Sequence, residues 1–522
     1  MDSTALHPST DSGHQPLVNN TENTNGTPTG NGEDNKPKQR RGSRQNTNQS
    51  TRPSLTLNRV KTTLFVPERS VGPAPTILGS IKSIVLASWL NVLLVFIPVS
   101  WALNFAQPDN HTLIFVFAFL AIIPLAKLLA VATDELSMRV GQTLAGLINA
   151  TLGNAVELIV AIIALTKCEL QIVQSSLIGS ILSNLLLVLG MCFFAGGIKY
   201  SEQGFGAVAT QLNSSLLTIS VIAVLLPAAF QMNVNTQGSN NDSDASQDIL
   251  KMSHGVALLQ LLIYVAYLIF QLYSHATLYL SDKNEFKSTR YQSRSKKKHV
   301  EEEAGTIPES LSTTRQGTMT STTLAASGEL PPAEVAPTEK SAEEVEEVEE
   351  PTMSLFMAIG LLAVVTVLVA VTAEWLVGSI DGLTEGSPIT KEFVGVILLP
   401  IVGNAAEHVT AVTVSVKDKL TLSLGVAVGS SIQIALFVIP FIVILAWILG
   451  KPLPLLFDPY ESITLFLAVI TVNYCVQDGK SNWLEGLILM FLYLIIGVTF
   501  WFYPGQTFQD RGLDYFCNGV QI

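Results

Sequence analysis

The feature that most constrains the fold is a series of long apolar segments that are almost free of charge. A segment of roughly 20 such residues can cross the hydrocarbon core of a bilayer as a helix. Eleven of them occur in this chain, with a polar stretch after the sixth. We expect these spans at 83–105, 111–132, 142–166, 172–197, 206–231, 253–277, 354–379, 392–416, 421–449, 460–477 and 483–503. The sequence therefore predicts an all-α polytopic membrane protein with about 11 transmembrane helices.

Charge is distributed unevenly along the chain. The formal net charge is -12, yet 370 of the 522 residues together carry only 21 acids and 12 bases. Soluble proteins carry about 25% charged residues, so this part of the chain cannot face water on all sides, and membrane lipid is its expected partner. A soluble enzyme with an anchor is excluded, and the polar parts contain no nucleotide loop or nucleophile arrangement. Nucleic-acid binding is not expected of an acidic chain.

Composition divides the chain into five parts. The tail 1–80 and the linker 281–352 are polar, and we expect both to be disordered, with an acidic segment ending the linker. Spans 1–6 lie in 81–280 and spans 7–11 lie in 353–505, followed by a short tail at 506–522. Basic residues crowd the flanks of spans 1 and 6, which predicts a cytosolic N-terminus and linker and a lumenal C-terminus.

The four cysteines are far apart in the sequence. Cys168, Cys192, Cys475 and Cys517 form no closely spaced pair. We therefore expect neither a disulfide framework nor a thiolate metal site.

The chain repeats itself at an offset of 250 residues. The segment GNAVE at 153–157 recurs as GNAAE at 403–407, and the match extends to Gly-Ser at 179–180 and 429–430. A second pair, Thr-Asp-Glu ending at Glu135 and Thr-Ala-Glu ending at Glu374, lies in spans 2 and 7. The eighth span comes five spans after the third, and five is odd, so the two copies of the motif cross the membrane in opposite directions. The sequence predicts two inverted five-helix repeats, spans 2–6 and 7–11, with span 1 extra.

The repeated motifs carry the candidate binding residues. Asn154 and Glu157 lie three apart on a helix and share a face, as do Asn404 and Glu407. A single membrane asparagine can equally be interhelical glue, but two glutamates in matched motifs indicate function, because an intramembrane carboxylate is costly. Two carboxylates with two amide oxygens suit a hard divalent cation, so we expect Glu157 and Glu407 to bind Ca2+.

Seven further residues are candidates for supporting or gating roles. They are His408, Glu135, Glu374, Ser180, Ser430, Ser183 and Gln433. Each has a plainer interpretation that the sequence leaves open. A serine can bond to the carbonyl one turn back, the histidine can be a packed helix residue, and Glu135 can lie among headgroups at a helix end.

The glutamate pair also suggests a mechanism. Two carboxylates in a dry site cannot both stay ionised, because burial and like charge favour the neutral form. Protons or one divalent cation can neutralise them, and these occupants exclude each other. Competition for the same oxygens would couple cation movement in one direction to proton movement in the other. This mechanism needs no cofactor.

Taken together, these residues resemble the two signature repeats of the vacuolar cation/proton exchangers, a family of the calcium/cation antiporter superfamily. The similarity covers roughly 80–280 and 353–505 and excludes the N-terminal tail and most of the linker. The segments that carry it are GNAVELIVAIIAL at 153–165, GNAAEHVTAVTVSVKDKL at 403–420, GSILSNLLLVLG at 179–190 and GSSIQIALFVIP at 429–440.

The resemblance implies a Ca2+/H+ antiporter of the vacuolar membrane that moves cytosolic Ca2+, and in part of the family Mn2+, into an acidic lumen. It implies that Glu157 and Glu407 are the central acidic pair beside Asn154 and Asn404, and His408 stands where the family motif has its histidine. Two alternatives remain: a Na+-coupled Ca2+ exchanger of the same superfamily, and a cation channel. The oligomeric state is not indicated by the sequence.

Overall fold

A computed structural model describes residues 71–236, 242–275, 278–279, 288–290, 351–511, 513 and 515–521. Almost all of the predicted disordered tail and linker, including the acidic segment, lies outside these residues. Every structural statement below concerns the described residues.

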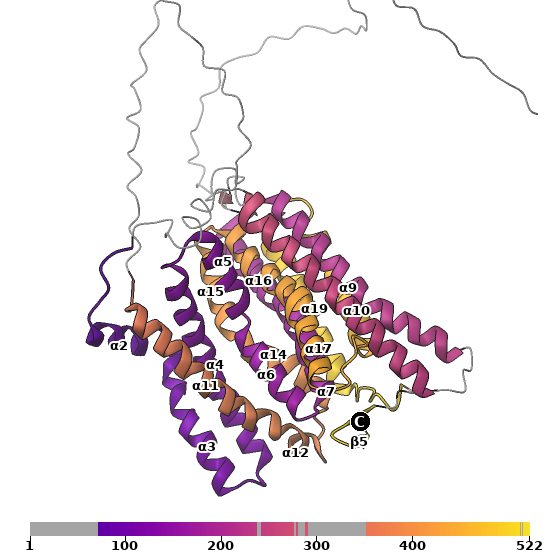
Figure 1. Cartoon of the computed structure of the whole chain (residues 1–522). Helices are drawn as coiled ribbons and strands as arrows, with labels where there is room; N and C mark the ends of the chain where they lie inside the picture. Colours follow the sequence, from indigo (N-terminus) through magenta and orange to yellow (C-terminus); the bar gives the residue numbers. More distant parts are fainter. Residues whose placement is uncertain are drawn as a thin grey trace, which may run out of the picture. The chain divides into compact units, whose positions relative to one another are not determined.

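Helices make up most of the first half of the chain (Figure 1). In this half η1 is a 3-10 helix, η2 and η3 are π-helices, and β1 and β2 are short strands. The elements are α2 (Ile77–Leu86), η1 (Trp89–Val95), α3 (Phe96–Ala106), α4 (His111–Ser137), α5 (Gln142–Leu152), α6 (Ala155–Thr166), α7 (Leu170–Leu182), η2 (Ser183–Val188), α8 (Leu189–Lys199), β1 (Tyr200–Gly204), α9 (Ala207–Thr236), α10 (Asp242–Ile269), η3 (Phe270–Ser274) and β2 (Thr289–Arg290).

The second half has the same character, with η5 and η6 as π-helices. Its elements are α11 (Leu355–Gly378), α12 (Ile380–Thr384), α13 (Lys391–Phe393), η5 (Val394–Leu398), α14 (Leu399–Gly403), α15 (Ala405–Val416), α16 (Leu420–Gln433), η6 (Ile434–Val438), α17 (Ile439–Ile448), α18 (Pro459–Cys475), β3 (Lys480–Ser481), α19 (Trp483–Phe502), β4 (Phe516–Cys517) and β5 (Val520–Gln521).

The predicted polytopic all-α architecture is confirmed. Eight helices of the described chain are long and apolar enough to cross a membrane, and two bent helix pairs raise the number to ten. These ten correspond to ten of the predicted spans. The remaining segment, 460–477, is α18, whose 17 residues are at the lower limit for a crossing. The number of eleven spans therefore stays a prediction.

Two contacts between distant segments mark opposite ends of the helix bundle. At one end β1 pairs antiparallel with both β2 and β3, and we call this the sheet end. At the other end a disulfide joins Cys168 to Cys517 across 349 residues, with the two Cα atoms 6.0 Å apart, and we call this the disulfide end. The expectation of no disulfide was wrong, because packing of the C-terminal segment against the α6–α7 turn brings together cysteines that no sequence spacing pairs.

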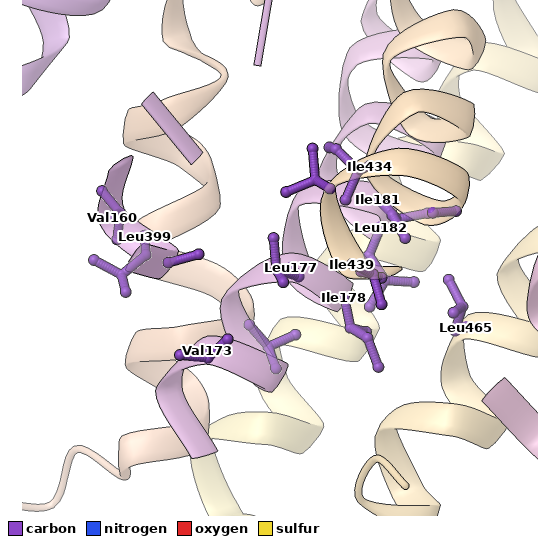
Figure 2. Packing of buried hydrophobic residues seen from close by; sticks show 14 of the residues in the cluster. Val160, Val173, Leu177, Ile178, Ile181, Leu182, Leu399, Ile434, Ile439 and Leu465 are labelled. Atoms are coloured by element: carbon purple, nitrogen blue, oxygen red, sulfur yellow. The ribbon is translucent and has the colours of Figure 1, made fainter. Parts of the chain in front are cut away.

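The centre of the bundle is built around α7. Twelve of its 13 residues are buried, so this helix contacts protein on all sides. Figure 2 shows Leu177, Ile178 and Ile181 of α7 close to Ile434 and Ile439 from the second half. The two halves thus share one apolar core. This shared core fixes the positions of the helices from both halves that pack against it.

Local geometry recurs at the sequence offset of 250. Helices α6 and α15 each have 12 residues, and both are followed by a residue with φ of 65°, Cys168 and Asp418. They end at opposite ends of the bundle: Cys168 is at the disulfide end, whereas Asp418 accepts a 3.1 Å hydrogen bond from Gln203 of the sheet-end strand β1. These boundaries agree with the predicted repeat. The complete inverted five-helix architecture stays a prediction.

Candidate functional site

Both signature motifs lie at breaks in membrane helices. The chain bends by 45° between α5 and α6 and by 57° between α14 and α15. Asn154 and Asn404 occupy the breaks, and Glu157 and Glu407 lie in the first turns of the helices that follow. The spans predicted over 142–166 and 392–416 are thus each, in the structure, a pair of helices with a bend at the motif. Each glutamate instead lies at a helix N-terminus, where the partial positive charge of the helix dipole favours an anion.

The two motifs approach each other closely. A Cβ atom built on Gly403 of the second motif would lie 2.5 Å from Oε1 of Glu157, which belongs to the first. The absence of a side chain at Gly403 thus makes room for the Glu157 carboxyl group. Glu407 lies beside Asn184 of η2 and Ser430 of α16. Of the two glutamates, Glu157 is buried and Glu407 is partly exposed.

A hydrogen-bond chain connects the first motif to α16. Asn154 Nδ2 donates to Gln433 Oε1 at 2.7 Å, and Ser430 Oγ donates to Asn154 Oδ1 at 2.7 Å. Asn184 Nδ2 donates in turn to Ser430 Oγ at 3.1 Å. Asn154, Asn184 and Ser430 are buried. The chain orients three amide groups and a hydroxyl group around the glutamates.

The second motif is held by α7 and η2. Asn404 Nδ2 donates to the backbone carbonyl of Ser180 at 3.3 Å, and Ser183 Oγ lies 3.4 Å from Nε2 of His408. The structure therefore brings His408, Ser180, Ser183, Ser430 and Gln433 next to the two motifs.

Three buried oxygen atoms of this region have no hydrogen-bond donor among the described residues. They are Oδ1 of Asn184, Oδ1 of Asn404 and Oε2 of Glu407. Buried polar atoms in proteins are normally satisfied, so acceptors left open beside two carboxyl groups are suited to a cation or a proton. Groups of three or more histidine, cysteine or carboxylate residues that could hold a metal are absent from the described chain. Amide oxygens would have to supplement the two glutamates.

A cavity leads to the site from one side. It has a volume of about 240 Å3 and is lined by Glu407, Ser430 and Gln433 at its inner part and by Asp134 and Asn149 near the sheet end. On the other side of the motifs, a pocket of only about 20 Å3 is lined by Glu157, by Ser176 and Ser180, and otherwise by apolar residues. The smaller space accommodates on the order of one water molecule. The site is accessible from the sheet end and closed toward the disulfide end.

The structure does not bring Glu135 and Glu374 to this site. Glu135, near the sheet end, accepts a 2.7 Å hydrogen bond from the Thr352 backbone N–H and pairs with Arg139 at 3.4 Å. Glu374, near the disulfide end, pairs with Lys167 at 2.9 Å. These contacts pair each carboxylate with a basic residue away from the two motifs, so a supporting or gating role for either stays a prediction.

Sequence reasoning assigned Glu407, Ser430 and Gln433 of the cavity lining but missed other polar residues there. Asp134, Asn149 and Thr410 lie along it. A signal was present for Asp134, which is the middle residue of the Thr-Asp-Glu triplet in span 2. The other two have no repeated motif, and only the packing of α4, α5 and α15 brings them together.

Broken helices that carry paired glutamates inside an apolar bundle define a polytopic membrane protein with an interior site suited to cations. The chain matches the family model described as "Sodium/calcium exchanger protein" over residues 110–273 and 357–502. It belongs to this family.

Individual relatives support the same assignment. The chain is 51% identical over 503 residues to a "Vacuolar calcium ion transporter" of Cryptococcus neoformans, covering 90% of this chain and 82% of that protein. It is 39% identical over 418 residues to a "Ca(2+)/H(+) antiporter" of Synechocystis, covering 79% and 97%. Among solved structures, "Structure of native YfkE" matches with a TM-score of 0.57 and 29% identity over 79% of this chain and all of that one.

Proposed function

We propose that this protein is a Ca2+/H+ antiporter that moves cytosolic Ca2+ into an acidic organelle in exchange for lumenal protons. The observation that carries the proposal is that Glu157 and Glu407, from two broken helices, meet at the contact between the two motifs, with Glu407 lining the larger cavity and Glu157 lining the small pocket on the other side. Relatives named as vacuolar calcium ion transporters and Ca2+/H+ antiporters support it. The proposal requires no cofactor and assigns no enzymatic activity.

In the proposed mechanism, Ca2+ is the substrate and the two glutamates are its charged ligands. Asn404 and Asn184 each offer an open amide oxygen. Ser430 holds the amide group of Asn184, and the Ser180 carbonyl holds that of Asn404. Ca2+ binds six to eight oxygen ligands, so oxygens of this kind and waters from the cavity would complete its shell. When Ca2+ leaves, the buried carboxyl groups take up protons, because two uncompensated charges in a dry site are strongly unfavourable.

Alternating access requires a second state in which the site opens toward the disulfide end. In the structure this route is closed by Leu177 of α7, Leu376 of α11 and Leu399 of α14, which line the small pocket beside Glu157. Movement of α6 and its neighbours relative to α7 would enlarge this pocket while closing the larger cavity. Charge neutralisation of Glu157 and Glu407 by either occupant allows the site to pass between the two states.

The proposed location is the vacuolar membrane, with the sheet end in the cytosol and the disulfide end in the lumen. The Cys168–Cys517 disulfide supports this orientation, because disulfides persist in oxidising compartments and are rare in the cytosol. It also agrees with the basic flanks of spans 1 and 6, which predict a cytosolic N-terminus.

Cysteine labelling tests the disulfide that supports this orientation. The other two cysteines, Cys192 and Cys475, are free. In protein denatured directly from vacuolar membranes, we expect a maleimide reagent to modify two cysteines before reduction and four after it. Replacing Cys517 with serine should raise the number before reduction to three. Four modified cysteines without reduction would contradict the disulfide and remove this support for the orientation.

Transport in proteoliposomes tests the function. An imposed pH gradient, acid inside, should drive uptake of radioactive Ca2+ against its concentration gradient, since each pH unit supplies about 1.4 kcal/mol per proton. Collapsing the gradient with a protonophore and a cation ionophore should stop it. Excess Mn2+ tests whether a second cation competes.

The alternatives predict different results in the same vesicles. Replacing Na+ with choline at a fixed pH gradient should leave uptake unchanged in a proton antiporter and abolish it in a Na+-coupled exchanger. A channel would carry Ca2+ currents that continue without a proton gradient and without counter-movement of protons. Either of these last two outcomes would refute the proposal.

A further inference from the structure

A second group of buried ionisable residues lies at the disulfide end, outside the site described above. It comprises Glu392 of α13, Glu461 of α18, Asp458 just before α18, and Arg511 of the C-terminal segment 503–511. Their exposed fractions are 0%, 1%, 3% and 6%. Three carboxyl groups buried around one guanidinium group need an explanation, and the proposed transport mechanism does not supply one.

Two members of the group have their own partners. Asp458 accepts hydrogen bonds from the Tyr503 hydroxyl at 2.9 Å, the Tyr460 backbone N–H at 2.8 Å and the Gln506 backbone N–H at 3.1 Å. Arg511 donates to the backbone carbonyl of Leu456 at 3.1 Å. Asp458 can therefore remain ionised. The Arg511 hydrogen bond goes to a neutral carbonyl group and does not pair the guanidinium charge with a carboxylate.

Glu392 and Glu461 are arranged differently, because they face each other. Gln171 Nε2 donates to Glu392 Oε1 at 2.5 Å, and the Glu461 carboxyl group lies within hydrogen-bonding reach of Glu392. A hydrogen bond between two carboxyl groups requires that one of them carries a proton. Glu392 Oε2 and Glu461 Oε1 are buried without a donor among the described residues. The pair thus has the geometry of a shared-proton site with open acceptor positions.

The surrounding charges favour one bound proton. If all three carboxyl groups were ionised, Arg511 alone would oppose them in a region from which water is excluded. Burial also raises the pKa of the nearby Tyr503 hydroxyl, so this group stays neutral and adds no charge. The neighbouring Lys391 is paired with Glu169 at 3.6 Å and with Asp381, which directs its charge away from the pair. Neutralising one carboxyl group relieves the excess charge at the lowest cost.

The C-terminal segment lies directly over the pair. A Cβ atom on Gly505, which has φ of 80°, would lie 2.6 Å from Glu392 Oε1. Gln231 Nε2 of α9 donates to the Arg511 carbonyl at 2.5 Å, and the disulfide from Cys517 to Cys168 anchors the chain further on. Packing of this segment therefore depends on the charge beneath it.

We propose that Glu392 and Glu461 form a second proton-binding site, separate from the transport glutamates, which takes one proton from the compartment at the disulfide end and holds the C-terminal segment in place. With the proton bound, Arg511 and Asp458 balance each other above a pair that carries one negative charge. Without it, an additional buried charge repels its neighbours and weakens the docking of the segment. The site senses the acidity of that compartment and does not depend on the proposed Ca2+ exchange.

Infrared spectroscopy tests the proposal without measuring transport. The full-length protein would carry Glu157→Gln and Glu407→Gln, so that the transport glutamates contribute no carboxyl signal. Going from acidic to alkaline pH, we expect to lose absorption from a buried protonated carboxyl group, and adding Glu461→Gln should remove that signal. The exposed Glu385→Gln, at the same end of the bundle, is the matched control and should leave it unchanged. Persistence of the signal in the Glu461→Gln protein would overturn the proposal.

Thermal unfolding provides an independent measurement in case the spectra are crowded. Stability supplied by the shared proton is present at acidic pH and lost as the pH rises and the pair releases it. The Tm of the parent should therefore fall between acidic and alkaline pH, and this fall should be smaller in Glu461→Gln, whose amide donates to Glu392 without titrating. A proton site would be contradicted if the Tm of Glu461→Gln fell with pH as much as that of the parent. It would also be contradicted if Ca2+ stabilised the Glu392–Glu461 pair in the protein that carries Glu157→Gln and Glu407→Gln.

Discussion

Glu157→Gln and Glu407→Gln are each expected to abolish pH-driven Ca2+ uptake. Glutamine keeps the size of the side chain and a hydrogen-bonding oxygen but removes the charge and the proton site. Each variant leaves a divalent cation with one carboxylate in a site that contains only two. Breaking a buried charge pair costs about 3–5 kcal/mol, which corresponds to a loss of roughly 150-fold to 4,000-fold. The measurement is initial uptake into proteoliposomes at a fixed pH gradient.

The matched control for these variants is Glu202→Gln. Glu202 is an exposed glutamate of β1 that pairs with Lys480 at 3.2 Å on the surface of the sheet end. A surface ion pair of this kind contributes about 1 kcal/mol or less, so uptake should stay near that of the parent. Ca2+ should also raise the Tm of the parent and of Glu202→Gln but not of the two site variants. Transport retained in both Glu157→Gln and Glu407→Gln would refute the assignment of the site.

Gly403→Ala is expected to inactivate transport although it adds only one methyl group. The new Cβ would lie 2.5 Å from Oε1, 3.2 Å from Cδ and 3.6 Å from Cγ of Glu157, so the carboxyl group has to move. Overpacking at a buried contact costs about 1–3 kcal/mol, and displacement of one ligand weakens Ca2+ binding further. We expect uptake to fall at least about tenfold, with a higher Ca2+ concentration needed for half-maximal rate.

Gly360→Ala is the control for this substitution. Gly360 lies within α11, and a Cβ atom built there has no neighbour within 4 Å. Alanine should therefore be accommodated, and uptake should resemble that of the parent. Size-exclusion chromatography and Tm distinguish a displaced Glu157 from a protein that fails to fold. If Gly403→Ala folds and transports Ca2+ like the parent, Glu157 does not occupy the position described here during transport.

Much of the architecture could be predicted because membrane insertion depends on local composition. A run of about 20 apolar residues is recognisable whatever it packs against. The glutamates of the two motifs were equally accessible to sequence reasoning, because a charged residue repeated inside an apolar span has few purely structural explanations. The offset of 250 between Glu157 and Glu407 linked them before any contact was known.

Other features depend on where distant segments come to lie. Asn154 and Asn404 occur in segments that are mostly apolar, so hydropathy indicates one uninterrupted span in each. In the structure each segment is instead a pair of helices with a bend between them. Glu135 and Glu374 match in the repeat, yet one pairs with Arg139 and the other with Lys167 at opposite ends of the bundle. Similar sequence positions thus acquired different surroundings.

By itself the sequence determined that the chain crosses a membrane many times and carries a repeated acidic motif within its spans. Only the tertiary structure decided that the cavity opens toward the sheet end, that Cys168 meets Cys517, and that Glu392 faces Glu461 beneath the C-terminal segment. The physical reason is that hydrophobicity and helix formation act within about 20 consecutive residues. Contacts between residues hundreds of positions apart are set by how the helices pack, which no single segment specifies.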